Sequence, residues 1–274
     1  MSGGLLEAFR VKFCAVVATH HKTGTAWMQS VFRRIARVLD VGFVEIDRRD
    51  GLESGSLIVP SILFNTHSAF SGCQWILDHP QCRLFHLIRD PRDVIVSAMH
   101  YHRAAAEPWL HEPRADFGGK TYQMFANGLP DDQSRYVFEM QHGAGNAIKA
   151  MRRWQYDREN TFECRYEDLI SDTNSEKFAG VLRHLGFEDD EMTRCRRIFV
   201  RNSLFGSRKK KGHSLHVRSG RARQWETTFN AELASAFVDL FGDVLIELGY
   251  EPDNSWVATL PSRGEQERAA GPPT

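Results

Sequence analysis

Apolar stretches alternate with amphipathic stretches over the first hundred residues. The apolar runs predict strands at residues 13–18, 42–46, 57–65 and 84–89, and Pro60 weakens the first half of the third. The periodicity predicts a helix at residues 25–39 and another after Asp90-Pro91, where the aspartate suits the N-cap and the proline the first helical position. Strands separated by helices imply right-handed crossovers. We therefore predict an α/β fold with a central, mainly parallel sheet flanked by helices.

The second half of the chain is less regular. Residues 103–145 mix glycines and prolines with aromatic side chains, which predicts a partly helical excursion that serves as a lid or lines an acceptor pocket. A helix at 147–157, a strand at 162–166 and helices at 175–185 and 231–248 complete the predicted fold. We assign residues 1–260 to one domain and the polar residues 261–274 to a disordered tail.

Composition narrows the class of protein. The 274 residues carry 35 basic and 35 acidic side chains, so no global field favours nucleic acid or an anionic membrane. No apolar run reaches the roughly 18–20 residues that span a bilayer, and the N-terminus is a poor secretion signal. The five cysteines are scattered without a C-x-x-C pair. They predict reduced, buried thiols in a cytoplasmic protein without a structural metal.

A short loop after the first strand is the strongest candidate for chemistry. Residues 18–27 read Ala-Thr-His-His-Lys-Thr-Gly-Thr-Ala-Trp, with a lysine inside a strand-to-helix turn. A helix that begins this way offers unpaired N–H groups and a positive dipole end to an anion. The loop is not a Walker P-loop, because Lys22 precedes the glycine. The alternative is an ordinary turn capped by Thr25.

Two further motifs carry groups suited to anions. Arg89 ends the strand before Asp90-Pro91, and Ser97 lies two turns into the following helix; an arginine fork beside a hydroxyl suits a phosphate monoester. Each residue alone also fits an ordinary role, a surface ion pair for Arg89 and a packed helix serine for Ser97. The run from 208 to 223 is rich in lysine and arginine, with Trp225 and Phe229 as anchors. It fits a solvated face or a segment that closes over a polyanion.

Together, and with Tyr166-Glu167-Asp168-Leu169, these motifs resemble the signature elements of sulfotransferases that use 3′-phosphoadenosine 5′-phosphosulfate (PAPS). The resemblance covers about residues 10–250 and implies the P-loop-like sulfotransferase fold with PAPS as co-substrate and no metal. It implies that Lys22 and the loop residues Thr23, Gly24, Thr25 and Ala26 hold the 5′-phosphosulfate. It places the adenine near Trp27, Tyr166 and Ser203. It assigns the 3′-phosphate to Arg89, Ser97, Arg218, Ser219 and Gly220.

The catalytic base is also suggested by the resemblance. His67 ends a predicted strand and matches the family's K-T/S-H segment, so it is the candidate general base, with Lys22 as its catalytic partner. The chain departs from the family pattern at four positions. Asn65 stands where the family has a lysine, His21 where it has a proline, Ser219 where it has the lysine of R-K-G, and Arg223 where it has a glycine.

These motifs favour transfer of a sulfuryl group from PAPS to a hydroxyl or amine of a small-molecule acceptor. A kinase-like phosphotransferase and a non-catalytic nucleotide-binding protein are the alternatives. For the acceptor, the aromatic residues of 103–145 favour a flat or apolar molecule, whereas His100, His102 and His111 are compatible with a polar or anionic one. No nucleic acid or membrane partner is expected. A homo-oligomer is possible, although no dimer motif matches around residues 226–232.

Overall fold

The computed structural model describes residues 14–46, 60–203 and 220–270. They group into two compact units. We call residues 14–89 with 154–203 the sheet unit, and residues 90–153 with 220–270 the helical unit. The prediction of one domain over residues 1–260 stays a prediction.

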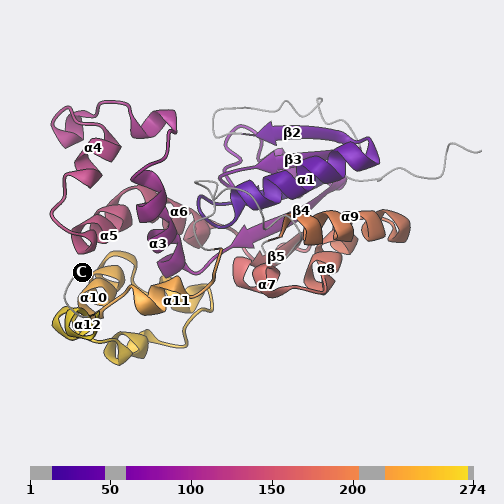
Figure 1. The fold of residues 1–274 in the computed structure, drawn as a ribbon. Helices are drawn as coiled ribbons and strands as arrows, with labels where there is room; N and C mark the ends of the chain where they lie inside the picture. Colours follow the sequence, from indigo (N-terminus) through magenta and orange to yellow (C-terminus); the bar gives the residue numbers. More distant parts are fainter. Residues whose placement is uncertain (1–13, 47–59, 204–219, 271–274) are drawn as a thin grey trace, which may run out of the picture. The chain divides into compact units, whose positions relative to one another are not determined.

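The sheet unit is built on five parallel strands in the order β2-β3-β1-β4-β5 (Figure 1). Its strands are β1 (Cys14–Thr19), β2 (Gly42–Ile46), β3 (Ser61–Asn65), β4 (Cys82–Ile88) and β5 (Thr161–Arg165). Its helices are α1 (Thr25–Leu39), α2 (Trp75–Asp78), α7 (Tyr166–Ser171), α8 (Glu176–His184) and α9 (Asp189–Asn202). The predicted α/β fold with a parallel sheet is confirmed.

The central strand β1 is buried on both faces of the sheet. Ala15 and Val17 face a core with residues of α1, α8 and α9, whereas Cys14 and Val16 face a second core on the opposite side. A strand buried on both faces reads as a continuous apolar run, which explains why the sequence located β1 well. The loops after the parallel strands therefore emerge together at one edge, where ligands of such sheets bind.

Helix α9 was not predicted from the sequence. It begins with a capping box in which the Glu188 side chain accepts from the backbone of Glu191, and Glu191 in turn accepts from the backbone of Glu188. Glutamate is an unusual N-cap, so the usual Ser, Thr, Asp or Asn signal is missing. The buried side of α9, with Cys195 and Phe199, packs in the same core as α1.

The helical unit contains α3 (Pro91–His102), α4 (Tyr122–Asn127), α5 (Asp132–Gln141), α6 (Gly143–Arg153), α10 (Ala231–Phe241), α11 (Val244–Glu247) and α12 (Arg263–Ala270). Four 3-10 turns complete it: η1 (Pro108–Leu110), η2 (Ala115–Phe117), η3 (Gln224–Thr227) and η4 (Asn254–Thr259). Helix α3 begins as the sequence predicts, because the Asp90 side chain accepts from the N–H of Arg92 and Pro91 follows the cap.

Three sequence predictions differ from the structure in this unit. The helix expected at 147–157 is α6, which ends earlier, at Arg153. The helix expected at 231–248 is split into α10 and α11, because Gly242 has φ +57° and ends α10. The tail expected to be disordered over 261–274 contains α12; Arg263 pairs with Asp131 and Glu267 and holds this helix. Among the described helices, none combines the length and apolarity needed to cross a bilayer.

Candidate functional site

The turn between β1 and α1 is held by the backbone of His20. The His20 carbonyl accepts from Thr23 N at 3.1 Å, from Thr23 Oγ1 at 2.8 Å and from Thr25 Oγ1 at 2.7 Å. The His20 N–H donates to Thr23 Oγ1 at 3.0 Å. Within this turn Lys22 has φ +66° and Gly24 has φ +107°. The hydroxyls of Thr23 and Thr25 therefore stabilise a tight turn in which Lys22 and Gly24 adopt left-handed backbone conformations. We call residues 20–26 the donor loop.

The first turn of α1 is left without a side-chain cap. Gly24 is the N-cap residue and has no side chain to accept a bond, and the first turn holds no acidic residue. The first bond along the helix runs from Met28 N to Gly24 O, at 3.0 Å. Thr25 does not cap the helix, as the ordinary-turn alternative required, because its hydroxyl bonds Thr19 and the His20 carbonyl. The helix start thus presents N–H groups and a positive dipole end suited to an anion.

Arg89 and Tyr166 lie against this loop within the sheet unit. Arg89 follows β4, is 4% exposed and donates to the carbonyl of Lys22 at 3.2 Å. Its guanidinium lies 4.4 Å from the centre of the Tyr166 ring, a cation–π contact. A Cβ added to Gly24 would stand 3.0 Å from Cδ2 of Tyr166. Three predicted site elements therefore meet at the carboxyl edge of β1, β4 and β5.

An aromatic cluster continues from Tyr166 to α9. Trp27 packs edge-on to Tyr166, with ring centroids 6.0 Å apart, and against Phe199 at 5.4 Å. One turn after Phe199, Ser203 ends α9 and donates from Oγ to the carbonyl of Val200 at 2.6 Å. The structure thus brings Trp27 and Tyr166 into direct contact, and it adds a ring that the sequence did not predict, Phe199 on α9, against Trp27.

His67 lies on a turn after β3 that Asn65 organises. Asn65 is fully buried; its Oδ1 accepts from His67 N at 3.1 Å and from Ala69 N at 3.2 Å, and its Nδ2 donates to Ala69 O at 2.7 Å. Ser68 ties the same turn to β1 by donating to the carbonyl of Thr19 at 2.9 Å. Asn65 therefore holds the backbone of the turn that carries His67, which accounts for an amide at this position.

The remaining predicted residues lie elsewhere. Ser97 is half-buried on α3, and Gly220 has φ +59°; both belong to the helical unit. Arg218 and Ser219 lie outside the described residues. The predicted anchors of the third motif are buried in the helical unit: Trp225 donates from its backbone to Asp93 Oδ1 at 3.0 Å, and Phe229 is fully buried.

The excursion at 103–145 forms its own aromatic core. Phe117, Tyr122 and Phe138 pack together there and are nearly inaccessible to solvent. The histidines named as acceptor candidates have protein partners. His102 is buried against Glu139 Oε1 at 2.7 Å, His111 contacts the Ala105 carbonyl at 3.1 Å, and His100 contacts the Tyr136 hydroxyl at 3.3 Å. Phe117, Tyr122 and Phe138 therefore stabilise the excursion itself, and the three histidines are hydrogen-bonded within the protein.

Sequence reasoning missed a buried histidine beside the donor loop, His86, and the half-buried Glu163 next to it. His86 on β4 lies 2.8 Å from His20, Nε2 to Nε2, and 2.5 Å from Glu163 on β5, Nδ1 to Oε2. Burial lowers the pKa of His86 to about 3, so its ring is neutral. Burial also raises the pKa of Glu163 to about 7. The available signal was a histidine inside the otherwise apolar run 84–88.

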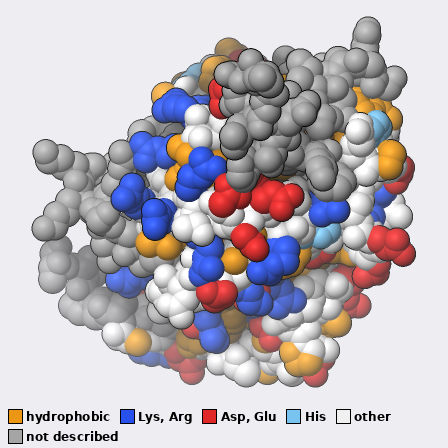
Figure 2. All heavy atoms as spheres, turned by 90° about the vertical axis from the view of Figure 1, so that its right-hand side faces the viewer, with side chains coloured by type: hydrophobic (Ala, Val, Ile, Leu, Met, Phe, Trp, Pro, Cys, Tyr) orange, Lys and Arg blue, Asp and Glu red, His pale blue; other side chains and the backbone are white. Residues whose placement is uncertain are grey.

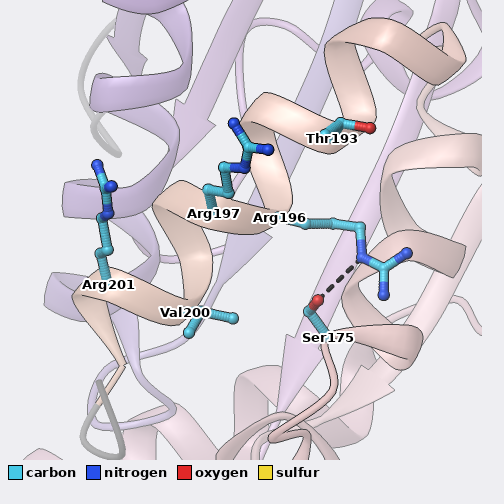
Figure 3. A pocket seen from close by; sticks show the side chains of 6 residues that line it. All are labelled: Ser175, Thr193, Arg196, Arg197, Val200 and Arg201. Carbon is cyan, nitrogen blue, oxygen red and sulfur yellow. Dashed lines mark hydrogen bonds between the residues drawn. The ribbon is translucent and has the colours of Figure 1, made fainter. Parts of the chain in front are cut away.

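A separate hollow on the sheet unit lies over α9. It is lined by Ser175, Thr193, Arg196, Arg197, Val200 and Arg201. The Arg196 side chain donates to the Ser175 hydroxyl at 2.9 Å, whereas the side chains of Arg197 and Arg201 point away from Ser175 (Figure 3). None of these residues belongs to the predicted donor site.

The face drawn in Figure 2 mixes lysine and arginine with aspartate and glutamate side chains.

No metal centre accompanies the site in the part of the chain that the structure describes. Across residues 14–46, 60–203 and 220–270, no three His, Cys, Asp or Glu side chains gather as metal ligands. The groups at the donor loop are a lysine, an arginine and helix N–H groups, which bind anions. The described site therefore has the chemistry of a phosphate-binding site.

Comparison with known proteins agrees with this chemistry. The family model for the sulfotransferase domain matches residues 14–249. The crystal structure of mouse sulfotransferase SULT7A1 complexed with PAP is similar, with a TM-score of 0.55 and 18% identity over 85% of this chain and 84% of that chain. Retinol dehydratase in complex with retinol and PAP gives a TM-score of 0.50 and 17% identity over 87% of this chain and 82% of that chain. No curated protein matches the sequence.

The two similar structures share the fold, and the family model spans most of the chain, including β1, the donor loop, Arg89 and Tyr166. The chain therefore belongs to the sulfotransferase domain family.

Proposed function

We propose that this protein transfers the sulfuryl group of PAPS to a hydroxyl or amine of a small-molecule acceptor, without a metal. The observation that carries the proposal is the uncapped start of α1. Lys22 and Gly24, both with positive φ, form the turn that precedes this helix. Arg89 and Tyr166 lie against the same turn. Membership of the sulfotransferase family supports it. Both comparison structures named above are complexes with PAP, the product that PAPS leaves behind.

In this proposal the donor loop holds the 5′ end of the nucleotide. The N–H groups of Gly24, Thr25 and Ala26 and the ammonium of Lys22 bind the phosphosulfate. Thr23 shapes the turn, because its N–H already donates to the His20 carbonyl. Trp27, Tyr166 and Ser203 line the adenine pocket. The groups assigned to the 3′-phosphate are Arg89, Ser97, Arg218, Ser219 and Gly220.

The chemistry needs a base and a stabilised leaving group. The acceptor oxygen attacks sulfur in line; a new S–O bond forms as the bond from sulfur to the bridging phosphate oxygen breaks. His67 takes the acceptor proton. The departing phosphate gains negative charge, which Lys22 and the N–H groups of α1 stabilise. Asn65 supports this assignment because it holds the backbone of the turn that carries His67.

The acceptor is proposed as a small apolar molecule that the segment 103–145 helps to bind. The retinol bound in one similar structure supports that view. The predicted cytoplasmic location is kept as part of the proposal. All five cysteines are buried and none forms a disulfide, which fits a reducing compartment.

Transfer from labelled PAPS across an acceptor panel tests the function. We expect Lys22→Ala and His67→Ala each to lower turnover by roughly 10²- to 10⁴-fold, the range for loss of a proton-transfer group or an electrostatic stabiliser. Arg89→Ala is expected mainly to raise the PAPS concentration required. Lys149→Ala, on an exposed helical position, is the control with unchanged activity.

Three outcomes would contradict the proposal. Full activity of His67→Ala would exclude His67 as the base. Turnover of ATP with magnesium, and none with PAPS, would favour the kinase-like alternative. Tight PAP binding without transfer to any acceptor would favour a non-catalytic nucleotide-binding protein.

A further inference from the structure

Three side chains form a continuous hydrogen-bonded chain below the donor loop. His20 Nε2 lies 2.8 Å from His86 Nε2, and His86 Nδ1 lies 2.5 Å from Glu163 Oε2. The other carboxylate oxygen, Glu163 Oε1, accepts from the indole N–H of Trp154 at 2.8 Å. The contacts of His86 with His20 and with Glu163 join imidazole and carboxyl atoms that can each carry or release a proton, so a change in the protonation of Glu163 can pass to His20.

The parallel sheet fixes these residues in place. His86 on β4 lies directly opposite Glu163 on β5 and opposite Ala18 on β1, two residues before His20. His20 and His86 are almost fully buried, and the His86 ring stacks on Trp154 with centroids 4.0 Å apart. Strand register and ring packing together leave the imidazoles little freedom to turn.

One end of the chain is the donor loop itself. The backbone of His20 holds Thr23 and Thr25 through four hydrogen bonds, so the position of its ring and the shape of the turn are linked. The other end, Glu163, retains 30% of its side-chain surface. A partly exposed carboxyl group can therefore exchange protons with water while the two histidines cannot.

The protonation state of Glu163 decides the tautomers of both histidines. A neutral imidazole carries one N–H. If Glu163 is ionised, it accepts from His86 Nδ1–H, His86 Nε2 accepts, and His20 carries its hydrogen on Nε2. If Glu163 is protonated, it donates from Oε2, so His86 carries its hydrogen on Nε2 and donates to His20 Nε2. The hydrogen of His20 then lies on Nδ1.

We propose that Glu163 and His86 are positioning residues that set the tautomer of His20 and, through it, couple donor binding at the loop to the protonation of Glu163. This inference rests on the proposed function only for the identity of the donor. The charged and titratable groups around the chain are Asp157, Tyr156 and Arg165, all within the sheet unit. Burial and the nearby Asp157 raise the pKa of Glu163 to about 7, which places the change near neutral pH.

The variant Glu163→Gln separates the two states. The Trp154 indole can only donate, so it holds the amide oxygen of the glutamine, and the amide NH₂ must donate to His86 Nδ1. The variant is therefore fixed in the tautomers of the protonated state at every pH. Glu159→Gln, which removes an exposed carboxylate shortly before β5, is the matched control.

Nitrogen NMR of histidine-labelled protein tests the tautomers without any assay of activity. In the unmodified protein we expect His86 to carry its hydrogen on Nδ1 at pH 8.5 and on Nε2 at pH 5.5. In Glu163→Gln we expect Nε2–H at both pH values, and in Glu159→Gln the behaviour of the unmodified protein. The same His86 tautomer in all three proteins at pH 8.5 would overturn the proposal, whatever reaction the protein catalyses.

Binding of PAP provides the second measurement. An ionised carboxylate at the end of the chain opposes anion binding. PAP itself changes charge in this range, because the second ionisation of a phosphate monoester lies near pH 6, so the readout is the ratio of PAP affinities of the unmodified protein and Glu163→Gln at the same pH. This ratio should fall by roughly three- to tenfold between pH 5.5 and 8.5, the size of one hydrogen bond. The ratio of the affinities of Glu159→Gln and the unmodified protein should stay constant across this range. An unchanged pH profile in the variant would overturn the coupling. Absence of PAP binding in every protein would instead count against the proposed function and leave the tautomer result standing.

Discussion

At the scale of single residues, Asn65 shows how one buried amide defines a candidate catalytic turn. Its oxygen accepts two backbone bonds and its nitrogen donates a third, all within residues 67–69. The resembled family carries a lysine here, and a buried lysine could not accept either N–H. Charge at the site must therefore come from other residues, and within the sheet unit Lys22 and Arg89 are the cations beside the donor loop.

Replacing Asn65 with alanine should loosen this turn. Three part-buried hydrogen bonds are lost, so we expect about 2–3 kcal/mol of destabilisation and a large drop in turnover, because His67 is no longer held. Urea unfolding with an activity assay measures both. Ser68→Ala, which removes only the bond to Thr19, should have a smaller effect on stability. Equal effects of the two variants would contradict the role given to Asn65.

Gly24 is the residue where backbone and packing act together. Its φ of +107° is strained for a side chain, and a Cβ would stand 3.0 Å from the Tyr166 ring. Gly24→Ala should therefore destabilise the protein by about 2–3 kcal/mol and weaken PAP binding. Gly118→Ala is the control, since Gly118 has φ +62° with open space around it and tests backbone strain alone. Equal unfolding midpoints of the two variants would contradict the packing argument.

At the scale of elements, the sequence predicted helix starts correctly where common N-cap residues bond the free backbone N–H groups. Asp90-Pro91 began α3 as predicted, whereas α9 was missed because glutamate forms its cap. Helix α12 was missed for another reason. Its sequence is polar apart from the two alanines at its end and offers no apolar stripe. The helix is held by Arg263, which pairs with Asp131, a residue 132 positions away in the chain. A pairing over that separation cannot be read from local periodicity.

Removing Arg263 should release α12. We expect Arg263→Ala to raise hydrogen exchange across residues 263–270, with other segments unchanged, because both ion pairs of this side chain are lost. Hydrogen-exchange mass spectrometry measures this. Arg268→Ala, at an exposed position in the last turn, is the control. Unchanged protection in Arg263→Ala would show that the ion pairs do not hold the helix.

Acid should have the same effect on this helix. Bonds from Ser134, then Arg263, lower the pKa of Asp131 from 3.8 to about 2. A carboxylate whose pKa is lowered on folding stabilises the folded state when the pH is above the pKa of the unfolded chain. This contribution is lost as the pH falls from 3.8 towards about 2. The protection of α12, taken as the intrinsic exchange rate at each pH divided by the observed rate, should therefore fall over that window.

At the scale of the whole molecule, all five cysteines lie in the sheet unit and are buried, and none forms a disulfide. Burial raises the pKa of Cys164 and Cys195 to about 12, so the reactive thiolate is scarce near neutral pH. The thiols therefore report on the integrity of the sheet and its two cores.

Thiol labelling should follow unfolding of this unit. We expect a thiol reagent at pH 8 to react slowly with the folded protein and to modify all five cysteines in urea. Saturating PAP should slow the reaction further, since a ligand that binds only the folded state suppresses opening. A thiol that reacts at once in the folded protein would contradict the burial described here.

By itself, the sequence determined the parallel α/β fold, the strand–loop–helix around residues 20–26 and the places of Lys22 and Arg89 just after two strands. These features rest on short-range causes: hydrophobic period, helix caps and glycine at a tight turn. The tertiary structure decided which side chains meet. The cation–π contact of Arg89 with Tyr166, the close approach of Gly24 and the register of His86 with Glu163 depend on strands distant in the chain. Sheet pairing creates such contacts, and no local pattern records them.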